Sequence, residues 1–285
     1  MPFYRATTAA IARWIPFITP TTVSFLVASF TRASVATVVN SQGLIEVVAP
    51  DTPRFDHDPA SGAPKGLLLE ESRTNVVRQS NEFSNAAWGK FRITATSSPD
   101  FPIFASGNVF LLTGNGVSGN KVAGCTFTPF TTPFTMSVFM RRGTNNFAQL
   151  ASYIDTIFFA NFDLLNGVVG NNSALSTIVT PGGNGWYRCT LTTASTTANA
   201  FVVFIVSSAT SPRAETNTLS TDIYVAGAQA ELGAFATSYI PTIASAVTRG
   251  GDFASITGPN FSSWYNNPIQ GTFGVEFQTL YICHE

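Results

Sequence analysis

Short runs of alternating apolar and polar residues fill the middle of the chain, from about residue 81 to residue 245. Clear examples are Phe134–Met140, Trp186–Thr192, Ala200–Val206 and Asp222–Gln229. Gly, Asn, Pro and Thr separate these runs, and turn residues at roughly ten-residue spacing are typical of an antiparallel sandwich. Long helical segments, which a parallel α/β sheet requires between its strands, do not alternate with the runs. The pattern therefore predicts an all-β fold, an antiparallel β-sandwich over residues 81–245.

Residues 30–80 precede the predicted sandwich and contain several closely spaced turn-forming residues. Thr37–Val39 and Leu44–Val48 are strand-like runs on either side of Ser41-Gln-Gly. Two such runs around a short loop with glycine predict a β-hairpin. We interpret residues 30–80 as a hairpin- and turn-rich block, called the linking block below, which joins the start of the chain to the sandwich.

The first 29 residues are apolar and are interrupted by prolines, unlike anything that follows. An arm this short cannot fold alone, so we expect it to bury its aromatic side chains against its own domain or against a larger assembly. Trp14–Thr31 carries no charge, but Pro16 and Pro20 and several hydroxyl residues lie within it. We therefore predict neither a membrane span nor a signal peptide, and expect a soluble protein made in the cytoplasm.

Residues 246–285 resemble the opening of another β module. Phe253–Ile256 and Gly271–Phe277 are strand-like, and a turn-rich stretch lies between them. Two strands alone do not make a stable sandwich. They therefore either begin a shortened second module or add to the preceding sheet or to partner chains.

The amino-acid composition excludes several classes of protein and of binding partner. Charged residues make up only 11% of the chain, against about 25% in a usual soluble domain. Strand- and turn-favouring Thr, Ser, Asn and Gly take their place, which excludes a coiled coil, a mostly helical bundle and a charged disordered chain. The formal net charge is −1 and the Lys and Arg residues are scattered. We therefore expect neither nucleic acid nor a membrane surface as a partner.

Cysteine and histidine usage argues against a metalloenzyme and against nucleophilic catalysis. Cys125, Cys189 and Cys283 are far apart and lack CxxC spacing, so we predict reduced, buried thiols. The chain has two histidines, His57 and His284, too few for a histidine-rich metal site. No GxSxG, HExxH, P-loop or GxGxxG motif occurs in a suitable context. We predict a protein that is not an enzyme and carries no cofactor.

A cluster of charged residues lies in the linking block of this otherwise weakly charged chain. Asp56, His57 and Asp58 could bind calcium, since hard cations prefer several oxygen ligands. The alternative, which we favour, is that the aspartates cap turns and that arginine–carboxylate pairs lock the block. The residues of this expected structural network are Arg54, Asp56, Asp58, Glu70, Glu71 and Arg73.

Four residues are candidates for glycan contact: Trp88, Tyr224, Gln229 and Glu231. Trp88 follows small residues and either stacks on a sugar or closes the end of the sandwich, with its indole N–H bonded to backbone. Trp186, which begins a strand, is expected in the core. Tyr224, Gln229 and Glu231 either line a concave face or belong to the solvated face of a strand.

Three long motifs resemble a family of bacteriophage structural domains. Pro53–Asn75 reads PRFDHDPASGAPKGLLLEESRTN, Ser80–Trp88 reads SNEFSNAAW, and Gly227–Thr242 reads GAQAELGAFATSYIPT. They resemble the blocks of phage head-spike or tail-fibre domains, and the similarity covers about residues 30–275. Ala246–Arg249 then resembles the lead into a LamG-like module, of which we expect a shortened form, and the arm of residues 1–29 does not fit the pattern.

The resemblance implies a carbohydrate-module-like jelly roll on the virion surface. It implies an oligomeric structural protein, by our expectation a homotrimer, that is assembled in the host cytoplasm and bound to phage capsid or tail proteins. Arm residues that suit attachment to the virion are Arg5, Arg13, Trp14 and Phe17. Two alternatives stay open: a host-recognition adhesin that binds a surface glycan, and a carbohydrate-binding module of a secreted bacterial protein.

Overall fold

The structure is a computed structural model that describes residues 29–128, 130, 133–152, 158–194, 199–255 and 257. Within these residues the chain forms twenty β-strands and no helix. The strands pair antiparallel throughout the two main sheets. The predicted all-β fold with antiparallel sheets is confirmed.

Two six-stranded sheets make up the sandwich. The first contains, in spatial order, β14 (Val168–Asn172), β13 (Phe159–Asp163), β12 (Phe147–Ala151), β17 (Ala200–Ile205), β10 (Lys121–Thr126) and β7 (Gly89–Phe91). The second contains β15 (Ser176–Gly183), β16 (Trp186–Thr193), β11 (Phe134–Arg142), β18 (Asp222–Leu232), β9 (Val109–Gly114) and β8 (Ile93–Ser98). All four alternating runs used to predict the sandwich are strands of these sheets.

The main core lies between the two sheets. Met136, Val138 and Met140 of β11 alternate along that strand and are fully buried in the same cluster as Val203 and Ile205 of β17. The outer face of β11 is buried as well. There, Phe139 joins a second apolar cluster with Ile45 of the linking block, so the block covers part of the outside of the second sheet.

The linking block contains two small antiparallel pairs. The predicted hairpin is confirmed: β2 (Ala36–Val39) pairs with β3 (Ile45–Val48), and its turn contains Gly43 at a φ of 76°, a left-handed conformation that favours glycine. Next along the chain, β4 (Phe55–His57) pairs with β5 (Pro64–Leu67).

The segment after residue 246 returns to the linking block. The strand β19 (Val247–Arg249) pairs with β6 (Arg73–Asn75), and β20 (Phe253–Ser255) pairs with β1 (Ser29–Thr31). The strand predicted at Phe253 is thus confirmed, and it pairs with β1 rather than with a strand of the sandwich. The strand predicted at Gly271–Phe277 and the arm of residues 1–28 lie outside the described residues.

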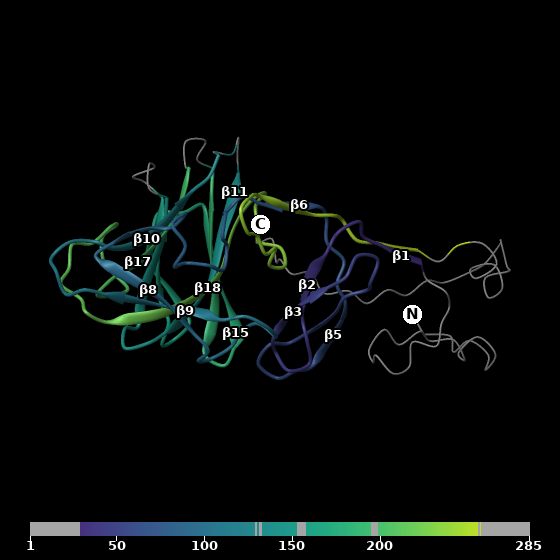
Figure 1. The fold of residues 1–285 in the computed structure, drawn as a ribbon, viewed down its shortest axis with the longest axis horizontal. Helices are drawn as coiled ribbons and strands as arrows, with labels where there is room; N and C mark the ends of the chain where they lie inside the picture. Colours follow the sequence, from purple (N-terminus) through teal and green to yellow (C-terminus); the bar gives the residue numbers. More distant parts are fainter. Residues whose placement is uncertain are drawn as a thin grey trace, which may run out of the picture.

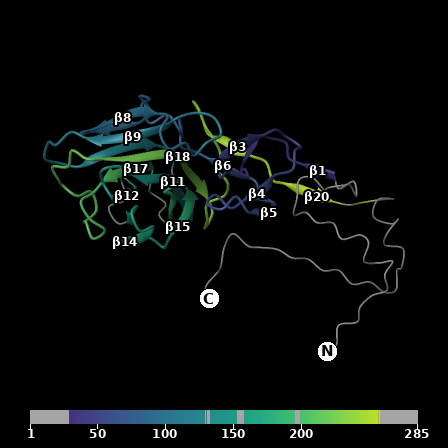
Figure 2. The same cartoon turned by 90° about the horizontal axis from the view of Figure 1, so that it is seen from below.

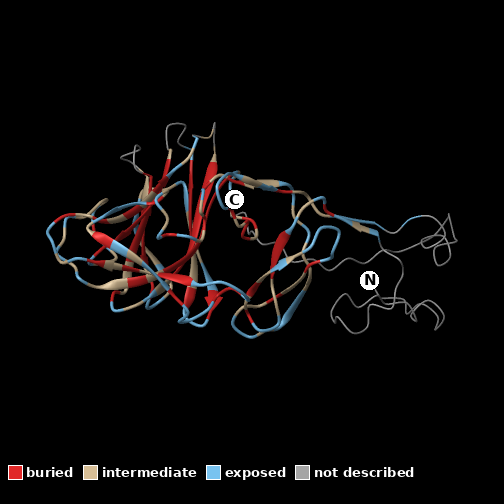
Figure 3. Cartoon of the chain, viewed as in Figure 1, coloured by how far each residue is buried: buried red, intermediate tan, exposed pale blue. Residues whose placement is uncertain are grey.

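The described parts follow one another along the long axis of the molecule (Figure 1). The sandwich lies at one end, the linking block follows it, and the pair β1–β20, called the ribbon below, lies at the other end (Figure 2). Burial is concentrated in the sandwich, whereas the ribbon is largely exposed (Figure 3). Both ends of the described chain therefore reach the same pole, away from the sandwich.

Candidate functional site

A buried group of charges joins the ribbon and β19 to the linking block. Asp252, which directly precedes β20, pairs through Oδ1 with Arg32 at 3.0 Å and through Oδ2 with Arg54. The same Oδ2 lies 3.8 Å from Nη1 of Arg249 and accepts the backbone N–H of Glu70 at 2.9 Å. We call these five residues the arginine cluster. None of its side chains is more than 5% exposed.

Glu70 is the second acid of the arginine cluster. Its Oε2 lies 2.9 Å from Nη1 of Arg54 and 3.5 Å from Nη2 of Arg249, and Ser238 donates to both carboxylate oxygens. Burial by itself would raise the pKa of Glu70, but the attraction of Arg249 and Arg54 and the Ser238 bonds outweigh it. The pKa of Glu70 therefore lies below its ordinary value.

The predicted network is present in part. Arg54 and Glu70 pair as expected, whereas Glu71 and Arg73 form a separate and more exposed pair. Sequence reasoning missed Arg32, Arg249 and Asp252, because the two latter residues reach the block only through strand pairings that span more than 170 positions. The sequence feature that could have identified Arg249 is the phage-like motif Ala246–Arg249, which was interpreted as the start of a following module.

Asp56 and Asp58 act separately. Asp58 accepts the backbone N–H groups of Ala60 and Ser61, as predicted for a turn cap, and these bonds lower its pKa. Asp56 instead accepts the backbone N–H of Val39, which joins it to the hairpin. Its pKa is raised because burial outweighs that hydrogen bond. No group of three or more His, Cys, Asp or Glu residues within the described ranges is arranged to hold a metal ion.

Neutralising Glu70 and neutralising Asp56 should change the free energy of unfolding in opposite directions, because the pKa of Glu70 is lowered and that of Asp56 is raised. We expect Glu70→Gln to lower the free energy of unfolding at pH 7 by roughly 3 kcal/mol, because Arg54 and Arg249 lose one of their two buried carboxylate partners. Since the folded pKa of Glu70 is depressed, the stability that its ionised form contributes is complete above the unfolded pKa of about 4.3 and is lost as the pH falls through the folded pKa.

For Asp56 the folded pKa is raised, so ionisation of its carboxyl lowers the free energy of unfolding as the pH rises. Asp56→Asn should therefore stabilise the protein at pH 7.

Urea unfolding of both variants at pH 7 and pH 4 measures this difference. The Glu70→Gln deficit should shrink at pH 4, and the Asp56→Asn gain should shrink as well. Two substitutions that shift stability in the same direction at pH 7 would contradict the assigned environments.

Trp88 is a core residue and not a sugar platform, which corrects the first interpretation of it. Its side chain is 1% exposed, its ring centroid lies 4.3 Å from that of Phe83, and Phe201 packs edge-on against it. The indole N–H donates to the carbonyl oxygen of Gln79 at 3.0 Å, which confirms the alternative we had stated. Trp186 is also buried, as predicted.

Gln229 and Glu231 contact neither glycan nor solvent, so both interpretations offered for them are wrong. Both are fully buried. Glu231 accepts the backbone N–H and the hydroxyl of Thr237, and Gln229 accepts the backbone N–H of Ile240. The physical reason is that the chain after β18 folds back over these side chains, which alternation along one strand does not reveal.

Cys125 and Cys189 are buried free thiols, as predicted, and burial raises both pKa values. Cys283 and the predicted attachment residues lie outside the described residues; the latter are Arg5, Arg13, Trp14 and Phe17. Within the described segments, no helix has the length and the apolar character needed to cross a bilayer.

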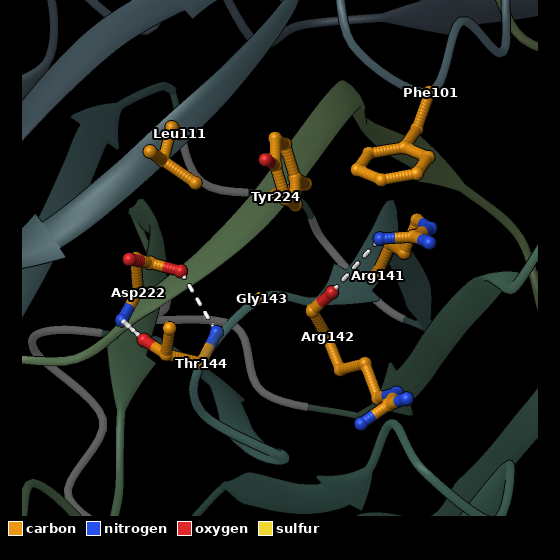
Figure 4. Close-up of a pocket in the computed structure, with 8 residues that line it drawn as sticks. All are labelled: Phe101, Leu111, Arg141, Arg142, Gly143, Thr144, Asp222 and Tyr224. Carbon is orange, nitrogen blue, oxygen red and sulfur yellow. Dashed lines mark hydrogen bonds between the residues drawn. The ribbon is translucent and has the colours of Figure 1, made fainter.

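Tyr224 is the glycan candidate that the structure leaves accessible, and it lines a surface hollow (Figure 4). In β18, Ile223 and Val225 point into the core, so Tyr224 lies on the outer face of the second sheet. Its cross-strand neighbours are Leu111 of β9 and Arg141 of β11. The Tyr224 hollow encloses about 330 Å³. It is lined by Phe101, Leu111, Arg141, Arg142, Gly143, Thr144, Asp222 and Tyr224.

Phe101 forms an aromatic wall with Tyr224. The two ring centroids lie 5.3 Å apart with the ring planes at 78°, and the guanidinium of Arg141 lies 3.4 Å from the Phe101 centroid. Phe101 has a φ of 51°, an uncommon backbone conformation for a bulky residue, and its carbonyl accepts the indole N–H of Trp186 at 2.8 Å. Sequence reasoning missed Phe101, because it lies in a loop without a motif.

Arg141 and Asp222 supply polar groups to the hollow. Arg141 donates to the carbonyl oxygens of Asn184 and Arg142, and although burial lowers its pKa it stays charged. Oδ1 of Asp222 accepts the backbone N–H of Thr144 at 2.9 Å. Burial, with the negative charges of Asp100 and Asp222, raises the pKa of Tyr224, so its hydroxyl is protonated at neutral pH.

No family model and no curated protein matches the sequence. Solved structures with similarity to the chain include the enzymatically active domain of tailspike protein 4 from bacteriophage CBA120, at 15% identity and a TM-score of 0.32. A second is the CBM22-1–GH10 part of Clostridium thermocellum xylanase 10B, in complex with xylohexaose, at 12% identity and a TM-score of 0.36. The similarity covers 55% and 60% of this chain, but only 21% and 30% of those two chains.

Proposed function

We propose that the protein is a non-enzymatic structural protein of a bacteriophage virion, an oligomeric spike, fibre or decoration protein on the head or tail. The observation that carries the proposal is that the sandwich and the ribbon lie at opposite ends of the molecule (Figure 1 and Figure 2). Ser29 of β1 and Ser255 of β20, which lie near the two ends of the described chain, pair with each other at the pole opposite the sandwich (Figure 2). This arrangement suits a module that is held at the ribbon and displays its sandwich outward.

The ribbon also supports self-association. All three residues of β20 are exposed, and the Phe253 side chain is 70% exposed. A two-stranded antiparallel ribbon is at best marginally stable in water by itself. Three ribbons around a symmetry axis would bury Phe253 against neighbouring copies, and closed symmetry is the usual outcome of such contacts. The phage-like motifs of residues 53–75, 80–88 and 227–242 support the virion context.

Light scattering of the purified chain tests the self-association. We expect a mass three times the chain mass of 30.4 kDa at micromolar concentration. Phe253→Ser should weaken the association at least about tenfold, as expected for loss of a buried aromatic anchor. Ile243→Ser is the matched control, because Ile243 is 74% exposed and belongs to neither strand of the ribbon.

Mass spectrometry of purified particles tests the virion location separately. The chain should be recovered from intact phage. A monomer at micromolar concentration that is absent from particles would refute the proposal and favour a carbohydrate-binding module of a secreted bacterial protein.

A further inference from the structure

We propose that the Tyr224 hollow binds a neutral pyranose sugar. The inference concerns the outer face of the second sheet and is independent of how the protein is mounted. A volume of about 330 Å³ lies at the lower end of the range of ligand pockets, roughly 300–1,000 Å³, and so suits one sugar ring.

The aromatic wall fits the apolar face of such a ring. Tyr224 is half-buried, and Phe101 is 37% exposed although it is a large apolar side chain. The two rings stand nearly perpendicular, at 78°, and form a corner (Figure 4). The C–H groups of a pyranose pack against aromatic faces, and a tyrosine adds a hydroxyl that can bond to the sugar.

The polar groups offer both an acceptor and donors. Oδ2 of Asp222 accepts no hydrogen bond from the described residues, while Oδ1 is fixed by Thr144. Arg141 and the protonated Tyr224 hydroxyl supply donors beside it. A carboxylate, a guanidinium and a phenol around one space match the hydroxyls of a sugar, which both donate and accept.

The charges around the hollow favour a neutral ligand. Asp222, with Asp100 close enough to raise the pKa of Tyr224, would repel an acidic sugar. Arg141 and Arg142 would repel a cation. Opposite charges in one small site therefore select against a strong net charge of either sign.

The site is held open before any ligand arrives. Phe101 adopts its uncommon backbone conformation and is fixed through its carbonyl by Trp186. A Cβ atom on Gly143 would collide with Oδ1 of Asp222, so glycine at this position lets the Asp222 carboxylate pack closely against the chain. Strained, over-determined residues often mark functional sites, and preorganisation reduces the cost of binding.

Saturation-transfer NMR on the full chain tests the proposal. The probes are the methyl glycosides of glucose, galactose, mannose, fucose and N-acetylglucosamine, with sialic acid as the acidic comparison. We expect at least one neutral glycoside to bind at millimolar concentrations. Asp222→Asn, which retains the shape of the side chain, should lower its affinity about tenfold to a hundredfold by loss of a charged acceptor. Tyr224→Leu should also lower it, because the apolar contact with Leu111 remains but the aromatic face is lost.

Asp163→Asn is the matched control, since the Asp163 carboxylate, like that of Asp222, accepts backbone N–H groups, but Asp163 belongs to β13 of the first sheet and does not line the hollow. It should leave the affinity unchanged, and melting curves of all variants should overlay that of the wild type. Three results would overturn the proposal. They are no detectable binding of any neutral glycoside, binding of sialic acid alone, and binding that Asp222→Asn does not weaken.

Discussion

Replacing Asp252 with alanine is expected to lower the free energy of unfolding by about 3–5 kcal/mol, the usual cost of removing one partner from a buried ion pair. Asp252 contacts Arg32, Arg54 and Arg249, and all four side chains are fully buried. Without it, Arg54 and Arg249 retain Glu70 as a buried carboxylate partner, whereas Arg32 retains, among the described residues, only backbone carbonyl acceptors. Urea denaturation at pH 7 with far-ultraviolet circular dichroism measures the change.

Glu71→Ala is the control for this prediction, because the Glu71 side chain is 60% exposed and pairs with Arg73 at the surface. Exposed ion pairs contribute about 0–1 kcal/mol, so its effect should be small. If Asp252→Ala unfolds at the same urea concentration as Glu71→Ala, the arginine cluster does not stabilise this end of the molecule.

Replacing Trp88 with alanine is expected to cost about 3–5 kcal/mol, as for other large aromatic residues removed from a packed core. The indole packs against Phe83 and Phe201, and its N–H satisfies the Gln79 carbonyl. The variant should therefore melt at a lower temperature, and loss of any sugar binding by it would report unfolding rather than a lost contact.

Phe91→Ala is the matched control, three positions further along the chain and 54% exposed. It should change the melting temperature little. A Trp88→Ala variant as stable as Phe91→Ala would show that the indole is not part of the core.

The sandwich could be predicted from sequence because its strands alternate and end at turn residues. Met136, Val138 and Met140 in β11 show the inward side plainly. The Gly43 hairpin could be predicted for a similar reason, since both of its strands are local.

The candidate site could not be predicted in the same way. Arg141, Tyr224 and Leu111 meet through the order of strands in the second sheet, and no local pattern specifies that order. The interpretation of Gln229 and Glu231 was wrong because the residues that cover their side chains come after the turn that follows β18, where strand alternation carries no information. Strand periodicity identifies two faces, but it does not show what packs on either face.

The antiparallel pairing of Ser29 with Ser255 has a topological consequence. The residues between β1 and β20 form one large insertion whose two ends lie at adjacent positions. Proteins tolerate exchange of an inserted domain best where its ends lie close together. The ribbon could therefore carry a different insertion without a change in its own geometry, as long as that insertion supplies residues equivalent to Arg32, Arg54 and Asp252.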